Sequence, residues 1–205
     1  MNKYFTYSIK DAESKSGVNN ILCDVDGVLM ECYAVINKVL IEEFNLSQDF
    51  RIQAKVKSWG MLELPEPIRN RALELMGNPE IVETYYFRPG SKKFVKTIYE
   101  IAKANGGELV FNTHCFNQAV ADVRAKQLTT LAAELGISPK YNISVGAKKI
   151  NANGKVIIDD YDGNLRNSEA PIKVHYGMFH NRGISVGFKS RNYVDIAKYL
   201  ESVCA

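Results

Sequence analysis

Short apolar runs alternate along the chain with longer segments in which apolar residues recur at the spacing of a helix. The apolar runs are rich in β-branched and aromatic residues. They predict one strand that begins at Ile21 and three more over residues 108–112, 141–145 and 156–159. Residues 172–176 and 184–188 also resemble strands. The helical spacing predicts helices over residues 34–44, 65–76, 91–104, 117–135 and 191–203. Strands and helices that alternate in this way are typical of an α/β fold with a mostly parallel sheet.

One segment interrupts the alternation, because residues 33–87 separate two strands that should be neighbours in the sheet. The segment contains two of the predicted helices and a polar stretch around Trp59. We therefore expect a small helical cap inserted after the first strand. The predicted division is an N-terminal extension (residues 1–20), a core (residues 21–32 and 88–205) and a cap (residues 33–87).

Composition narrows the class of protein. With 205 residues and a mass of 23.0 kDa, the chain has the size of one domain with a modest insert. Its formal net charge of +3 is too small to argue for a nucleic-acid partner. No apolar stretch is long enough to span a bilayer, and the N-terminus lacks the apolar core of a signal peptide. The four cysteines show no CxxC spacing, which favours a reducing compartment. We expect a cytoplasmic protein without a membrane partner, and the sequence leaves a homodimer open.

Two pairs of acidic residues follow two of the predicted strands. Asp24 and Asp26 end the first apolar run, and a regular strand through both would point their side chains the same way. Asp159 and Asp160 end the run at residues 155–158. Because the carboxyl ends of parallel strands meet at one edge of a sheet, the four acids would form a site of oxygen ligands. Like charges so close together cost energy unless a cation or a shared proton relieves the repulsion, and Mg²⁺ suits such a site.

A hydroxyl group and a lysine lie between the two acidic pairs. The predicted strand at residues 108–112 leads into Thr113, and the Lys148-Lys149 pair precedes Asp159 by about ten residues. The order along the chain is therefore acid pair, hydroxyl, lysine and acid pair. Any one of these residues alone would carry little information, and the order carries the argument.

This order resembles the four motifs of the haloacid dehalogenase (HAD) superfamily of phosphoryl-transfer enzymes, written here as DVDGV, FNT, a lysine and IIDD. The chain is also similar to the 5'(3')-deoxyribonucleotidase-like branch in its DVDGVL opening, its Ser58-Trp59 pair, its Arg88-Pro89-Gly90-Ser91 turn and its IDDYDGN segment. The similarity extends over residues 21–188. It implies a Rossmann-like core with a mostly parallel sheet of five strands, flanked by helices.

The resemblance also implies roles for the acidic residues. Asp24 would be the nucleophile that forms an aspartyl-phosphate, and Asp26 would protonate the leaving group and then deprotonate the attacking water. Metal ligands would come from Asp24, Asp159 and the backbone carbonyl of Asp26, with Asp160 binding a metal-bound water. The implied cofactor is Mg²⁺.

A phosphate-binding set is implied around this metal site. Thr113 would donate to the phosphoryl oxygens, and Gly27 would let the backbone approach the ligand closely. A dianionic phosphate beside two carboxylates and one Mg²⁺ still leaves net negative charge, so a lysine is needed. Lys149 fits the spacing better than Lys148. His114 either contacts the substrate or ends the strand.

The candidates for the substrate pocket lie in or beside the cap. Trp59, Tyr85, Tyr86 and Phe87 could form an aromatic wall against a nucleobase. Packing between cap and sheet is the competing interpretation for each of them. Arg88 either meets a phosphate or sugar or belongs to a surface turn.

The sequence thus predicts a Mg²⁺-dependent phosphomonoester hydrolase, with (deoxy)nucleoside monophosphates as the expected small-molecule substrates. One alternative keeps the chemistry but changes the substrate to a phosphosugar or a nucleic-acid 3'-phosphate. Another is a catalytically idle relative that serves as a binding module. The presence of all four motifs argues against the last of these.

Overall fold

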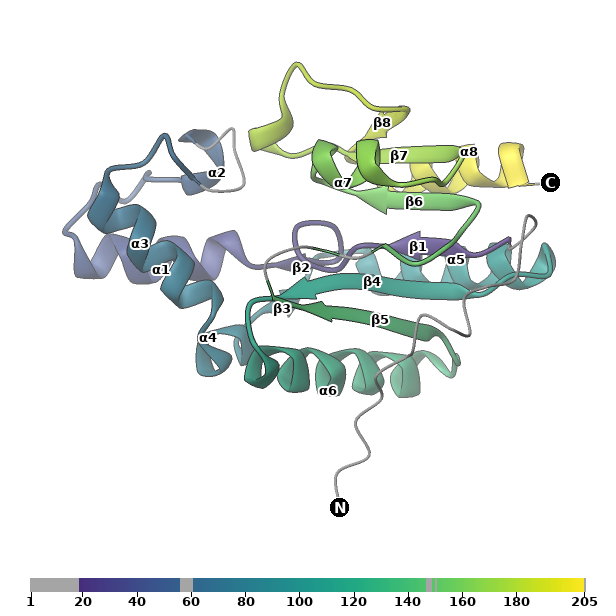
Figure 1. Ribbon diagram of the computed structural model, residues 1–205, viewed down its shortest axis with the longest axis horizontal. Helices are drawn as coiled ribbons and strands as arrows, with labels where there is room; N and C mark the ends of the chain where they lie inside the picture. The colour runs from purple at the N-terminus through teal and green to yellow at the C-terminus, as the bar shows by residue number, and fades with distance from the viewer. Residues whose placement is uncertain (1–18, 56–60, 147–148, 150, 205) are drawn as a thin grey trace.

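The computed structural model describes residues 19–55, 61–146, 149 and 151–204. Its centre is a parallel sheet of six strands in the order β5-β4-β1-β6-β7-β8 (Figure 1). The strands are β1 (Ile21–Cys23), β4 (Leu109–Cys115), β5 (Lys140–Val145), β6 (Val156–Asp159), β7 (Ile172–Tyr176) and β8 (Phe188–Ser190). The predicted α/β fold class is confirmed, with six strands in the sheet rather than five.

The sixth strand lies later in the chain than the sequence predicts. An apolar run suggested a strand at residues 184–188, whereas β8 begins at Phe188. Its three residues are half-buried and lie at the edge of the sheet, where Phe188 pairs with Val174 of β7. Pairing with β7 therefore sets its position, because an edge strand buries too little apolar surface to be located by its composition.

The five predicted helices are found close to their expected bounds. They are α1 (Tyr33–Glu43), α3 (Glu66–Met76), α5 (Ser91–Ala104), α6 (Gln118–Leu135) and α8 (Tyr193–Cys204). Local capping explains the agreement for α6, because the Asn117 side chain accepts from the backbone N–H of Val120 at 3.0 Å and Gly136 ends the helix at φ 61°. The short helices α2 (Ile52–Lys55), α4 (Pro79–Glu83) and α7 (Asp162–Asn167) were not predicted.

Alternate residues of the central strands pack on opposite faces of the sheet. Cys23, Phe111 and Ile158 belong to the larger hydrophobic cluster, which also contains the buried apolar residues of α5, α6 and α8. Leu22 and Ile157 belong to a smaller cluster with Leu165 of α7. Both faces of β1 are thus covered, which accounts for its uninterrupted apolar run.

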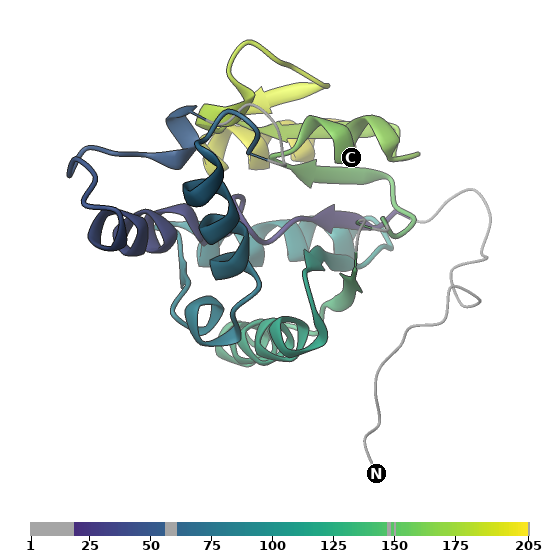
Figure 2. The same cartoon turned by 60° about the vertical axis from the view of Figure 1, so that its left-hand side comes forward.

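The helices α1 to α4 lie beyond the carboxyl ends of the central strands (Figures 1 and 2). The chain enters this segment through β2 (Met30–Glu31) and leaves it through β3 (Tyr86–Phe87), and these two strands pair antiparallel. Beside β2 and β3, Glu31 and Arg88 form a buried ion pair with a distance of 2.8 Å. The Ser58-Trp59 pair lies outside the described residues.

None of the helices within the described ranges is long and apolar enough to cross a membrane.

Candidate active site

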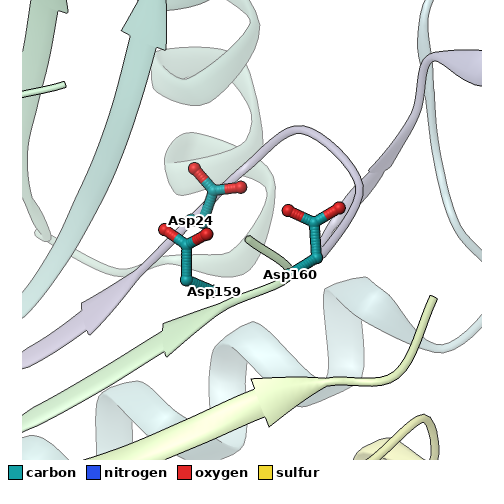
Figure 3. Close-up of side chains that lie close together, drawn as sticks. All are labelled: Asp24, Asp159 and Asp160. Atoms are coloured by element: carbon teal, nitrogen blue, oxygen red, sulfur yellow. The ribbon is translucent and has the colours of Figure 1, made fainter. Parts of the chain in front are cut away.

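Three carboxylates meet where β1 and β6 end. Asp24 follows β1 directly, Asp159 is the last residue of β6, and Asp160 comes next. Because the two strands are parallel neighbours, the backbone N–H of Asp24 donates to the carbonyl of Ile158 at 2.9 Å, and this bond places the strand ends side by side. Ligand oxygens of the three acids lie within 4.8 Å of one another, and all three residues are buried (Figure 3).

Lys149 bridges two of these carboxylates. Its Nζ lies 2.5 Å from Asp24 Oδ1 and 2.7 Å from Asp159 Oδ2, and its side chain is 6% exposed. Burial by itself would lower the pKa of Lys149, but the two carboxylates outweigh this effect and raise the pKa above its usual value. The two carboxylates thus favour the charged form of Lys149, whose ammonium group lies between Asp24 and Asp159. Lys148 lies outside the described residues.

The cluster holds more negative charge than this one lysine can balance. Burial raises the pKa of Asp24 well above its usual value, and Asp159 and Asp160 add to the rise while Lys149 opposes it. Burial, followed by the nearby Asp159, raises the pKa of Asp160 to about 8. Buried carboxylates that resist ionisation in this way gain from a second cation among them.

Hydrogen bonds from the start of α7 hold Asp159 in place. Its Oδ1 accepts from the backbone N–H of Tyr161 at 2.9 Å, and Asn164 Nδ2 lies 3.1 Å from both carboxylate oxygens. On the other side, the Asn181 side chain donates to the backbone carbonyl of Asp160 at 2.8 Å. These bonds come from segments that follow β6 and β7, so the orientation of the two acids depends on tertiary packing.

The carboxyl group of Asp26 lies outside the cluster, which corrects the expectation of one regular strand through Asp24 and Asp26. The strand β1 ends at Cys23, and the chain turns at Gly27, which has φ +79°. Asp26 Oδ1 instead meets Nη2 of Arg124 at 2.6 Å, and the Arg124 side chain is 1% exposed.

Arg124 was not singled out from the sequence, although a signal was present. It occupies the buried face of α6 together with Val120, Ala121, Leu128 and Leu131. A charged residue on an otherwise apolar helical stripe needs a partner of opposite charge, because an unpaired buried charge is very costly. The partner is Asp26, which the helical pattern alone could not identify.

Gly27 approaches Asp160 so closely that no side chain fits between them. A Cβ atom on Gly27 would lie 2.1 Å from Asp160 Oδ2, and its φ of +79° is a conformation that other residues resist. Gly27 therefore brings its backbone against Asp160, and the expected close approach of Gly27 to a bound ligand stays a prediction.

We expect Gly27→Ala to weaken binding of a divalent metal ion at least tenfold, because Asp160 must move away from the added methyl group. The left-handed conformation alone should lower the free energy of unfolding by about 1–2 kcal/mol. Gly106→Ala is the matched control, since Gly106 has φ +70° with no atom within 4 Å of an added Cβ. Calorimetric titration with the metal ion and denaturant unfolding measure the two effects. Equal metal affinities in the two variants would contradict the expectation.

A cavity of about 420 Å³ opens above the cluster. The acids Asp24, Asp26 and Asp160 line it together with Lys149 and Gly27. Further lining residues come from the inserted segment and from the ends of β4 and α6, namely Tyr33, Met61, Met76, Val82, Tyr85, Thr113, His114, Phe116, Val120 and Arg124. The cavity thus has a charged floor, and the rest of its lining combines apolar side chains with polar ones such as Asp162, Asn164 and His180.

Thr113 and His114 reach the cavity from the carboxyl end of β4. The hydroxyl of Thr113 is buried and has no hydrogen-bond partner within the described part of the chain, so it can donate to a ligand. Nε2 of His114 lies 2.6 Å from the carbonyl oxygen of Gly146. This contact ties His114 to the segment after β5.

Of the candidates for the substrate pocket, some line the cavity and others do not. Trp59 lies outside the described residues. Tyr86 is 50% exposed, Arg88 is buried in its ion pair with Glu31, and neither is among the described residues that line the cavity. Tyr85 does line it and is 6% exposed. Tyr85 directly precedes β3, and adjacent residues of an extended chain point to opposite sides, which explains why Tyr85 lines the cavity and Tyr86 does not.

The fold is shared with hydrolases of known structure. A haloacid dehalogenase-like family hydrolase from Streptococcus pneumoniae has a TM-score of 0.53 at 12% identity, covering 89% of this chain and 98% of that one. A hydrolase from Pseudomonas syringae has a TM-score of 0.52 at 15% identity, with coverages of 91% and 99%. A HAD-superfamily hydrolase from Geobacter sulfurreducens has a TM-score of 0.52 at 14% identity, with coverages of 92% and 99%. At these identities the similarity establishes the fold.

The six-stranded parallel sheet and the motifs at its carboxyl edge define a hydrolase of the haloacid dehalogenase superfamily. The family model for "5' nucleotidase, deoxy (Pyrimidine), cytosolic type C protein" matches residues 18–203, and the chain belongs to this family. Family membership makes it a phosphomonoester hydrolase. A sequence comparison with curated proteins found no match.

Proposed function

We propose that the protein is a Mg²⁺-dependent phosphatase that hydrolyses (deoxy)nucleoside monophosphates through a phosphorylated Asp24. The observation that carries the proposal is the position of Lys149 between Asp24 and Asp159 on the floor of the cavity. This arrangement puts a nucleophilic carboxylate beside a fixed cation, which an anionic phosphate ester requires. The family description supports a nucleotide as the ester.

The donor set fits a divalent metal ion. Three buried carboxylates lie within 4.8 Å of one another, and oxygen ligands of this kind suit Mg²⁺ better than softer metals. Asp24, Asp159 and Asp160 would hold the ion. A bound Mg²⁺ would neutralise charge on the phosphoryl group and orient it for in-line displacement.

The chain supplies the remaining chemistry. Asp24 attacks phosphorus as the bond from phosphorus to the ester oxygen breaks, and Asp26 gives a proton to the departing oxygen. Lys149 and the Thr113 hydroxyl donate to the phosphoryl oxygens throughout. A water molecule then attacks the phosphoryl group on Asp24, Asp26 accepts its proton, and inorganic phosphate leaves.

In this proposal residues 33–87 act as a cap over a core of residues 21–32 and 88–205. Support comes from the cavity lining, because Tyr33, Met61 and Tyr85 face the charged floor from the inserted segment. These side chains offer apolar and aromatic surface to a nucleoside. Most of the predicted extension (residues 1–18) lies outside the described residues.

A cytoplasmic site of action is part of the same proposal. The family description names a cytosolic type, and all four cysteines are buried and free of disulfides. Free thiols of this kind persist in a reducing compartment.

The test is phosphate release from dUMP, dTMP, dGMP, a 3'-nucleotide, a sugar phosphate and an oligonucleotide 3'-phosphate, each with Mg²⁺ and with EDTA. We expect release that EDTA abolishes and that is fastest on deoxynucleoside monophosphates. Equal rates on all esters would retain the hydrolase chemistry and contradict the nucleotide assignment. If none of these esters releases phosphate, the proposed function is overturned.

We expect Mg²⁺ to raise the melting temperature more at pH 8.5 than at pH 6. The raised pKa of Asp160, about 8, means that the folded protein without metal keeps a proton that the unfolded chain releases near pH 4. Folded protein therefore binds more protons between these values, and its free energy of unfolding falls as the pH rises. Mg²⁺ must displace this proton at pH 6, and much less so at pH 8.5, so it binds more tightly at the higher pH.

Thermal unfolding with Mg²⁺ and with EDTA at the two pH values measures this difference. Asp160→Asn is the control, because it removes the proton in question and should flatten the pH dependence. Equal Mg²⁺-induced shifts at pH 6 and pH 8.5 in the unaltered protein would contradict the expectation.

A further inference from the structure

We propose that Arg124 is a positioning residue that holds the Asp26 carboxyl group by Oδ1 and thereby assigns proton transfer with the substrate to Oδ2. The inference rests on the proposed function and adds a residue to it. It pairs Asp26 of the first motif with a residue that none of the four motifs contains, because Arg124 lies on α6.

The contact between the two side chains is short and one-sided. Arg124 Nη2 lies 2.6 Å from Asp26 Oδ1. The Arg124 side chain is 1% exposed, whereas 34% of the Asp26 side chain is exposed. Oδ2 of Asp26 receives no hydrogen bond from the described residues, and Asp26 lines the cavity. One oxygen of the carboxyl group is therefore engaged by Arg124, and the other remains for a ligand.

The chemistry of the guanidinium decides which oxygen moves a proton. An arginine side chain only donates hydrogen bonds and keeps its own proton under all ordinary conditions. The oxygen that faces it must therefore be an acceptor, so a proton on Asp26 is carried by Oδ2. In the first step this proton passes from Oδ2 to the departing ester oxygen, and in the second step Oδ2 takes a proton from water.

Contacts from the inserted segment hold Arg124 itself in place. Its Nη1 donates to Oε1 of Gln127 at 2.9 Å, and Nε2 of Gln127 donates to the carbonyl of Val82 at 2.9 Å. The guanidinium carbon also lies 5.6 Å from the centre of the Tyr85 ring. Val82 belongs to α4, and Tyr85 follows this helix. The orientation of Asp26 is thus anchored from two sides and does not depend on the turn at Gly27 alone.

A positioning role and a merely structural role predict different kinetics. Loss of a structural ion pair lowers the amount or stability of active protein and reduces turnover of every ester by the same factor. Loss of positioning harms only esters whose leaving group needs a proton. The alkoxide of a nucleoside needs one, whereas p-nitrophenolate leaves without assistance.

The experiment compares kcat/KM for dUMP and for p-nitrophenyl phosphate in Arg124→Gln, Arg124→Lys and the unaltered protein, all with Mg²⁺. This constant contains only the steps up to release of the leaving group, so the later attack of water does not enter. The ratio of the two constants is also independent of the fraction of protein that is folded. Lys126→Gln is the matched control, because Lys126 is exposed on the same helix and pairs with Glu83 of α4 at 3.1 Å.

We expect Arg124→Gln to lower kcat/KM for dUMP about 100-fold and that for p-nitrophenyl phosphate less than about threefold. Arg124→Lys should recover part of the dUMP activity, since an ammonium group also only donates. Gln127→Met, which removes an anchor of Arg124 without changing charge, should lower the same ratio by a smaller factor. Lys126→Gln should leave the ratio unchanged.

An equal loss on both esters in the Arg124 and Gln127 variants would overturn the inference and leave the proposed function standing. A rise in KM for dUMP with an unchanged ratio of kcat values would also overturn it, because Arg124 would then bind the substrate directly. Unaltered protein that hydrolyses neither ester would instead contradict the proposed function. The two failures are therefore distinguishable.

Discussion

Asp24→Asn is expected to lower kcat on dUMP by about 10⁴-fold or more, because an amide oxygen is a poor nucleophile toward a phosphate ester. The fold should survive the change. Asparagine has nearly the shape of aspartate, and Lys149 keeps its contact of 2.7 Å with Asp159. Removing a buried acid whose ionisation is already opposed by its surroundings should leave the melting temperature unchanged or raise it. Steady-state kinetics and thermal unfolding on one preparation measure both effects.

Asp122→Asn provides the matched control for this prediction. It makes the same chemical change on the exposed side of α6, where Asp122 accepts a hydrogen bond from Gln118 at 2.9 Å. Its kcat should stay within about twofold of the unaltered value, as for surface substitutions generally. An Asp24→Asn protein that keeps more than about one hundredth of the unaltered kcat would exclude Asp24 as the nucleophile.

Lys149→Met is expected to lower the free energy of unfolding by about 3–5 kcal/mol at pH 8 in EDTA, because it leaves buried carboxylates without their cation. The side chains of Lys149, Asp24 and Asp159 are 6%, 9% and 1% exposed, so water cannot replace the missing charge. The same variant should lose at least about 100-fold in kcat, since no fixed cation then meets the phosphoryl oxygens.

The loss of stability in Lys149→Met should be smaller at pH 5 than at pH 8. The raised pKa of Asp24 and of Asp160 keeps protons on these acids in the folded state, and a neutral acid needs no counter-ion. The contribution of Lys149 to the free energy of unfolding therefore increases as the pH rises and decreases as the pH falls. Lys140→Met, at an exposed position at the start of β5, is the control. Denaturant unfolding at the two pH values measures the difference, and a loss below about 1 kcal/mol at pH 8 would mean that Lys149 acts as a surface lysine.

Features that depend on neighbouring residues in the chain were predicted well. Asn117 and Gly136 mark the ends of α6 because capping bonds and a left-handed conformation are local properties. The central strands were also found, since strands buried on both faces read as continuous apolar runs. The short helices α4 and α7 escaped prediction because five or six residues are too few to show a helical period.

The residues of the candidate site also differ in how far the sequence predicts their positions. Asp24, Asp159 and Asp160 could be expected together, because the carboxyl ends of neighbouring parallel strands always meet at one edge. The contact between Asp26 and Arg124 could not, since it joins residues 98 positions apart through the packing of α6. The same limit applies to Tyr85 and Tyr86, because the sequence does not show which of two neighbouring rings lines the cavity.

The order of residues along the chain was thus sufficient to define the α/β class and the acidic edge, because strand periodicity and the geometry of parallel sheets follow from local rules. The kind of chemistry came from the resemblance of the four motifs to those of the haloacid dehalogenase superfamily. Three-dimensional packing was needed to bring Lys149 between two carboxylates, to turn Asp26 toward Arg124 and to close Gly27 onto Asp160. Each of these contacts joins segments whose separation in the chain contains no information about their distance in space. Burial then gives the contacts their strength, because charges held away from water interact far more strongly than exposed ones.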